Sequence, residues 1–191
     1  MLCLRSQTQD AWLERACSHT AEILVDHAHC ERKAATQALT MLARFPDKPE
    51  LVAPMIALAR EELEHFELVM TALPRYGGVM EAQVNSGYQT ELHAAVRKEM
   101  PGKLIDLLLV AGLIEARSCE RFKLLSEHHP DADLRAFFRS LLESEARHHA
   151  TFVRLAEGFA DRDSVRQRLG ELADHERAVL ERMPPLPRIH T

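Results

Sequence analysis

The feature that most constrains the fold of this chain is a pair of Glu-x-x-His motifs, each in the middle of a helical stripe of apolar residues. Glu62 and His65 lie in LAREELEHF, and Glu145 and His148 lie in LLESEARHH. Residues three and four apart share one side of an α-helix, so each motif falls on a face that is otherwise apolar. A carboxylate and an imidazole buried on such a face need a compensating charge.

Two further stripes with the same alternation of three and four residues carry one central glutamate each, Glu31 and Glu115. Glu115 lies 84 residues after Glu31, and the two Glu-x-x-His motifs lie 83 residues apart. Offsets this similar predict two copies of one helical pair, with pseudo-repeats at about 10–74 and 103–160.

Helical periodicity, together with the positions of proline and glycine, predicts the elements. Helices are expected over about 10–45, 50–73, 103–128, 131–159 and 164–182, with a short one at about 90–99. The connection 75–102 is long enough to cross from one end of a domain to the other. The expected fold is all-α, with four core helices, one long crossover connection and an additional C-terminal helix, in a single domain of residues 1–191.

Composition narrows the class of protein. Hydrophobic residues make up 46% and charged residues 28%, and the longest wholly apolar run, 107–114, is far shorter than the roughly 20 residues of a membrane-spanning helix. The N-terminus has no signal-peptide core, so a cytoplasmic protein without membrane contact is expected. Four scattered cysteines without a C-x-x-C pair indicate neither a disulfide framework nor a zinc ribbon. The net charge of −5 provides no global basic field for nucleic acid.

Six side chains are expected to project into one helical core and to form a site for two metal ions: Glu31, Glu62, His65, Glu115, Glu145 and His148. Two divalent ions cancel the charge of four carboxylates, so the loaded site is neutral. Oxygen and imidazole ligands without a thiolate suit iron or manganese. One Glu from each of two helices, with Glu-x-x-His from the other two, is the known arrangement of ferritin-like di-iron and di-manganese proteins. The sequence therefore predicts a ferritin-like four-helix bundle.

A second register is open, because Glu61 with His65 and Glu145 with His149 are i, i+4 pairs that also share a face. The three-four stripes favour Glu62 and His148 instead. His27, one turn before Glu31, is interpreted as a core histidine rather than as a partner of the metal site.

Four segments of the sequence resemble one particular family: DHAHCERKAA, EELEHF, PGKLIDLLLVAGLIEARSCERF and ESEARHH. They are similar to the tRNA 2-methylthio-N6-isopentenyladenosine hydroxylases (MiaE). The resemblance implies a non-haem di-iron monooxygenase with two Fe ions, which uses O₂ and external electrons to hydroxylate the isopentenyl side chain of a modified adenosine beside the anticodon of tRNA. In family terms the six residues above are the iron ligands.

The same resemblance implies a tRNA partner and an electron donor. The sequence has no Gly-rich nucleotide-binding motif and no rubredoxin-like cysteine set, so a separate reductase or ferredoxin-type protein is expected to supply electrons. The candidate tRNA contacts are the basic residues that bracket the long connection, Arg75, Arg97, Lys98 and Lys103, with Tyr76 and Tyr88 for base stacking.

Two other functions fit the same metal site. One is a quinone or small-molecule hydroxylase on a di-iron bundle, and the other is a ferritin- or rubrerythrin-like protein that stores iron or handles peroxide. About two irons per chain is the stoichiometry expected of a hydroxylase.

Overall fold

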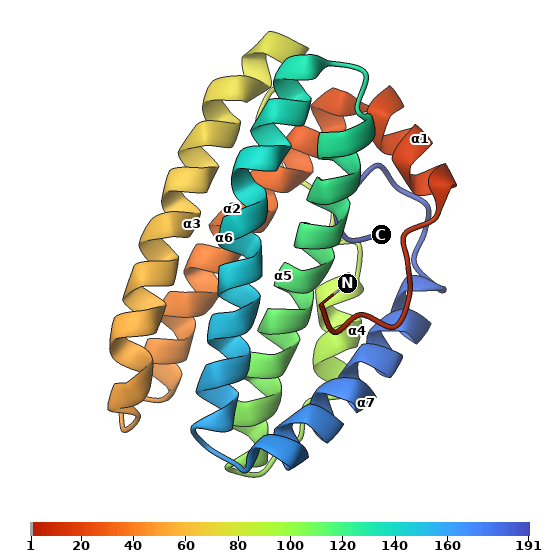
Figure 1. Ribbon diagram of the computed structural model, residues 1–191. Coiled ribbons are helices and arrows are strands. Elements are labelled where there is room, and N and C mark those ends of the chain that lie inside the picture. Colours follow the sequence, from red (N-terminus) through yellow and green to blue (C-terminus); the bar gives the residue numbers. More distant parts are fainter. Residues whose placement is uncertain (1) are drawn as a thin grey trace. The chain divides into compact units, whose positions relative to one another are not determined.

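The computed structural model describes residues 2–191, and within that range every regular element is a helix (Figure 1). The α-helices are α1 (Asp10–Ser18), α2 (Thr20–Arg44), α3 (Val52–Ala72), α4 (Tyr88–Ala94), α5 (Gly102–His128), α6 (Ala132–Glu157) and α7 (Arg162–Leu180). Two 3-10 helices, η1 (Pro49–Leu51) and η2 (Leu73–Tyr76), flank α3. The prediction of an all-α protein is confirmed.

Backbone contacts divide the chain into two compact units. The α2–α3 unit comprises residues 18–84 and 187–189, and the α5–α6 unit comprises residues 2–17, 85–186 and 190–191. Each unit contains one pair of long helices, but residues 10–17 of the first predicted pseudo-repeat belong to the α5–α6 unit. The prediction of a single domain stays a prediction.

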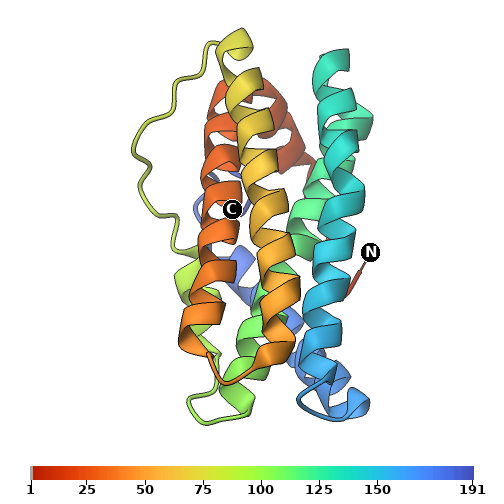
Figure 2. The same cartoon turned by 90° about the vertical axis from the view of Figure 1, so that its left-hand side faces the viewer.

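In the α2–α3 unit the two long helices run antiparallel, side by side, and a tight turn joins them (Figure 2). The turn closes with hydrogen bonds from the Phe45 amide to the Met41 carbonyl and from the Lys48 amide to the Phe45 carbonyl. Pro49 then begins η1, where a missing N–H costs nothing. The predicted apolar stripe of α3 is buried, including Leu58 and Val69 on either side of the motif.

In the α5–α6 unit, α5 is the central helix and packs against α6, α7 and α4 (Figure 1). Contact on several sides explains why every residue of the run 104–113 is buried. A Cβ at Gly112 would lie 3.3 Å from the Phe152 Cβ, so glycine permits the close approach of α5 and α6. Asp131 and Asp161 cap α6 and α7 by accepting hydrogen bonds from backbone amides of the first turn.

The first predicted helix, 10–45, is wrong in one respect: it is two helices, α1 and α2, interrupted at His19. His19 has φ −125° and ψ 47°, outside the helical region. Ser18, His19 and Thr20 are three consecutive residues of weak helix propensity, which makes this the easiest place to break the helix. Apolar periodicity alone did not reveal the break.

The long connection between the units leaves η2 at Gly77 and enters α4 at Gly87, both with positive φ, 74° and 89°. Two backbone carbonyls of the connection are held by side chains: His29 Nε2 lies 2.8 Å from the Glu81 carbonyl, and Arg188 Nη1 donates to the Val84 carbonyl at 2.8 Å. The short helix predicted at 90–99 is present as α4, but it begins and ends earlier, and η2 is an additional short helix. No helix within residues 2–191 combines the length and apolar composition that crossing a bilayer requires.

Candidate metal centre

The α2–α3 unit brings three predicted ligands together. Glu31 projects from the buried face of α2, and Glu62 and His65 project from the buried face of α3. Each of the three residues offers one oxygen or nitrogen atom, and these atoms lie within 4.8 Å of one another. We call this set the α2–α3 ligand set.

A fourth buried side chain belongs to this cluster. His27 Nε2 lies 2.5 Å from Glu31 Oε1, and His65 Nδ1 lies 3.6 Å from Glu31 Oε2 and 3.7 Å from Glu62 Oε2. His27 is fully buried one turn before Glu31, so it orients that carboxylate. The interpretation of His27 as an ordinary core histidine is therefore corrected.

These contacts shift the pKa values of two side chains in the α2–α3 ligand set. Burial acts to raise the pKa of Glu31, but the charge of His27 and hydrogen bonds with Glu62, His27 and His65 hold the pKa below its ordinary value. Burial acts to lower the pKa of His65, but hydrogen bonds with Glu31 and Glu62 raise it to about 10. The same carboxylates that favour a proton on His65 would favour a bound divalent cation, and binding the cation through this imidazole would release that proton.

The α5–α6 unit carries the second set, the α5–α6 ligand set. Glu115 lies on α5, and Glu145 and His148 lie on α6; all three side chains are buried. Glu115 and His148 offer ligand atoms within 4.8 Å of one another. Carboxylate and imidazole donors buried together suit a hard or borderline divalent cation, as in the first set.

Burial and hydrogen bonding support the preferred register over its rival. Glu62 is 1% exposed, whereas Glu61 is only partly buried. His149 Nδ1 lies 2.7 Å from the carbonyl oxygen of Gly112 on α5. This contact between α5 and α6 uses one of the two ring nitrogens of His149. His148 rather than His149 therefore shares the buried stripe with Glu145.

The predicted tRNA contacts meet different environments. Arg75 and Lys98 are exposed, and Lys103 is partly buried. Arg97 donates to Asp106 from its backbone amide at 2.9 Å and from Nη2 at 2.7 Å, so its guanidinium already has a carboxylate partner. Tyr88 is 1% exposed, so the expectation that it stacks on bases is wrong. The four basic residues stay predictions.

Sequence reasoning did not find a groove in the α5–α6 unit whose lining includes four arginines, Arg15, Arg117, Arg121 and Arg177. They come from α1, α5 and α7 and are separated by up to 162 positions in the chain. No spacing rule joins residues so far apart. The only available signal was the presence of Arg117 and Arg121 within an otherwise buried stretch of α5.

Comparison with known proteins places these features in a family. The curated relatives include the tRNA 2-(methylsulfanyl)-N(6)-isopentenyladenosine(37) hydroxylase of Pseudomonas putida, 40% identical over 158 residues, which are 83% of this chain and 77% of that protein. The hydroxylase of the same name from Salmonella typhimurium is 29% identical, and the match covers 84% of this chain and 77% of that protein.

Among solved structures, protein 43 with aldehyde deformylating oxygenase activity from Synechococcus is 43% identical. The match has a TM-score of 0.95 and covers 100% of this chain and 96% of that one. The predicted ferritin-like fold class is thereby confirmed. The model of the family described as tRNA-(MS[2]IO[6]A)-hydroxylase (MiaE) matches residues 1–191. The chain is a member of the MiaE family.

Proposed function

We propose that this protein is an O₂-dependent di-iron monooxygenase that hydroxylates the isopentenyl side chain of 2-methylthio-N6-isopentenyladenosine next to the anticodon of tRNA. The observation that carries the proposal is the match of the MiaE family model to residues 1–191, with both buried ligand sets present. The relatives from Pseudomonas and Salmonella are named for this substrate. A tRNA substrate makes the cytoplasm the expected location.

The proposed metal ligands are the members of the two ligand sets: Glu31, Glu62, His65, Glu115, Glu145 and His148. The burial of carboxylate and imidazole side chains in each set supports a need for bound cations. Two ferrous ions held there would supply the electrons and open coordination positions for O₂ chemistry. Four carboxylates and two divalent cations give a site without net charge.

The chain's own residues contribute position and exclusion of water. His27 holds Glu31 in place through its 2.5 Å contact. Leu58 and Val69 on α3, and Leu108 and Phe122 on α5, are buried on the same stripes as the ligands. These apolar neighbours would keep bulk water from the reacting groups.

The reaction also requires an electron donor. Incorporating one oxygen atom of O₂ as a hydroxyl group reduces the other atom to water, which consumes two electrons and two protons in each turnover. We propose that a separate reductase or a ferredoxin-type protein delivers these electrons.

The test is nucleoside analysis of tRNA from a strain that lacks this gene, complemented with the wild-type gene or with a Glu62→Ala variant. The hydroxylated nucleoside should disappear on deletion, return with the wild-type gene and stay absent with the variant. If deletion leaves the nucleoside profile unchanged, the tRNA assignment is wrong, whatever the metal content of the purified protein.

One observation favours a second candidate, an oxygenase that acts on a small molecule. The Synechococcus protein, 43% identical, is described by its aldehyde deformylating oxygenase activity. Iron-loaded protein incubated with a long-chain aldehyde, O₂ and a reductant should release formate if this activity is present here. An iron-storage role would instead show as many more than two irons per chain.

A further inference from the structure

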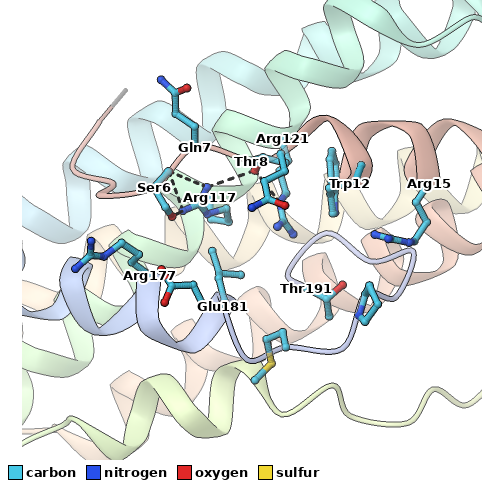
Figure 3. A pocket seen from close by; sticks show the side chains of 15 residues that line it. Ser6, Gln7, Thr8, Trp12, Arg15, Arg117, Arg121, Arg177, Glu181 and Thr191 are labelled. Atoms are coloured by element: carbon cyan, nitrogen blue, oxygen red, sulfur yellow. Dashed lines mark hydrogen bonds between the residues drawn. The ribbon is translucent and has the colours of Figure 1, made fainter.

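A groove in the α5–α6 unit is lined by basic side chains from elements that are distant in sequence (Figure 3). Its volume is about 320 Å³, within the range of sites that hold small ligands or parts of larger ones. One wall comprises the N-terminal segment before α1 and α1 itself, and the opposite wall comprises the end of α7 and the segment after it. All of its lining residues belong to the α5–α6 unit.

The floor of the groove contains two buried guanidinium groups that neighbouring groups hold in fixed positions. Arg117 donates from Nε and Nη2 to the carboxylate of Glu176 at 2.9 and 3.0 Å, and it also pairs with Glu120. Arg121 donates from Nε to Thr8 Oγ1 at 3.2 Å, and its guanidinium lies 4.6 Å from the ring centroid of Trp12. The floor is therefore preorganised rather than assembled around a ligand.

The electrostatics of the floor favour an anion. Burial, and then the positive charge of Arg117, lower the pKa of Arg121 to about 10. An anion beside Arg121 would offset both effects. Glu181 also lines the groove and places one carboxylate near Arg177 (Figure 3).

The rim supplies two more cations that can reach a ligand. Arg177 has half of its side chain exposed and only a 3.5 Å contact, with Asp174 on the same helix. Arg15 is partly buried at the other end of the groove (Figure 3). The wall formed by the end of α7 and the segment after it is partly apolar and includes Leu180, Met183 and Pro185.

We propose that this groove binds a phosphodiester segment of the RNA substrate, with phosphate oxygens at the rim arginines Arg177 and Arg15 and a ribose or base against the apolar wall. The inference rests on the proposed tRNA function and identifies a contact surface for it. Guanidinium groups match phosphate oxygens in a two-pronged geometry, and side-chain contacts to phosphate position a nucleic acid without reading its sequence. Arg117 is already paired with Glu176 and Glu120, so Arg121 and the rim arginines supply the local positive charge in a chain whose net charge is −5.

The chain offers a matched pair of variants for the test. Arg177 and Arg166 both lie on α7, and each contacts an aspartate three residues earlier, Asp174 at 3.5 Å and Asp163 at 3.9 Å. Only Arg177 lines the groove. Arg177→Gln and Arg166→Gln therefore remove the same charge from the same helix and leave the metal ligands intact.

The measurement is the affinity of full-length protein for the tRNA isolated from the gene-deletion strain, at several salt concentrations. R177Q should weaken binding about 3–10-fold and reduce the slope of log K against log salt by about 0.7, the value for one phosphate contact. R166Q should stay within about twofold of wild type, and R15Q/R177Q should lose about 10–100-fold. Equal affinity and slope for R177Q and R166Q would overturn the inference.

Two readouts separate this inference from the proposed function. If R177Q weakens tRNA binding and the deletion strain keeps its hydroxylated nucleoside, the groove binds RNA and the hydroxylase assignment is wrong. If the deletion strain loses that nucleoside and R177Q binds as R166Q does, the enzyme contacts tRNA elsewhere. Wild-type protein with no measurable tRNA affinity contradicts the groove directly. Unchanged melting temperatures of the variants exclude misfolding as the cause.

Discussion

The α2–α3 and α5–α6 helical pairs carry the same ligand pattern in different surroundings. Glu31 corresponds to Glu115, and the two Glu-x-x-His motifs correspond to each other. Four residues before the first glutamate, however, α2 has His27 and α5 has Ala111. In the α2–α3 ligand set the buried imidazole of His27 contacts the first carboxylate, whereas an alanine side chain at the corresponding position of α5 offers no such group.

The surroundings of the two pairs differ as well. α5 packs against α6, α7 and α4. Its Arg117 forms an ion pair with Glu176 of α7, and both side chains are 0% exposed. The outer side of α3 exposes apolar residues, among them Val52, Leu63 and Leu68. The two repeats share the stripe that carries the ligands. The other faces of the helices differ because they pack against different neighbours or meet solvent.

The largest expected effect concerns the α5–α6 unit. Arg117→Met leaves Glu176 as a buried carboxylate without its guanidinium partner, and we expect the free energy of unfolding to fall by about 3–5 kcal/mol. Urea denaturation measures the change. The double variant Arg117→Met/Glu176→Met removes both charges and should recover most of the loss. A change below about 1 kcal/mol in the single variant would show that this pair does not set the unit's stability.

The next effect tests whether the α5–α6 ligand set uses the predicted register. His148→Ala should abolish loading of one iron and lower the hydroxylation rate at least about 100-fold, since losing a group that only orients a ligand already costs 10–100-fold. His149→Ala, the adjacent control, should retain both irons and lose only stability, because His149 contacts the Gly112 carbonyl. Iron analysis that shows the reverse outcome would assign the ligand role to His149.

The asymmetry at His27 predicts a smaller effect. His27→Ala frees Glu31 to move, so iron affinity should fall by about tenfold at one site. The second site should keep its affinity, and a titration with ferrous ion followed by absorbance or calorimetry should therefore become biphasic. His29→Ala loses contacts with the Glu81 carbonyl and with Arg32 but none with a metal ligand, so it is the matched control and should give the wild-type titration.

The smallest effect is the acid sensitivity of the α5–α6 unit. Burial acts to raise the pKa of Asp106, but hydrogen bonds from Arg168 and Arg97 hold the pKa below its ordinary value of 3.8. The contribution of Asp106 to stability is thus complete above pH 3.8 and is lost as the pH falls through the lower pKa of the folded state. Between pH 6 and pH 3, wild type should lose about 1 kcal/mol more than Asp106→Asn in urea denaturation. Parallel losses would contradict this role.

The sequence by itself determined the helical pairs and the six candidate ligands, because both depend on local periodicity. Glu62 and His65, or Glu145 and His148, share a face wherever their segment is helical, and the 83-residue offset shows that the two motifs belong to one repeated pattern. The i, i+4 contact between His27 and Glu31 is equally local, but the spacing did not distinguish a partner of the carboxylate from an ordinary core histidine, and the interpretation of His27 was wrong.

Only the tertiary structure decided which polar side chains find partners far along the chain. The carboxylate of Asp106 accepts hydrogen bonds from Arg97 and from Arg168, which lies 62 positions further along the chain. Tyr88 is buried with its hydroxyl donating to Glu176 at 3.2 Å. The arginine groove draws its lining from α1, α5 and α7. Such meetings depend on how helices pack, and helical periodicity fixes the face of each helix but not the neighbour that the face meets.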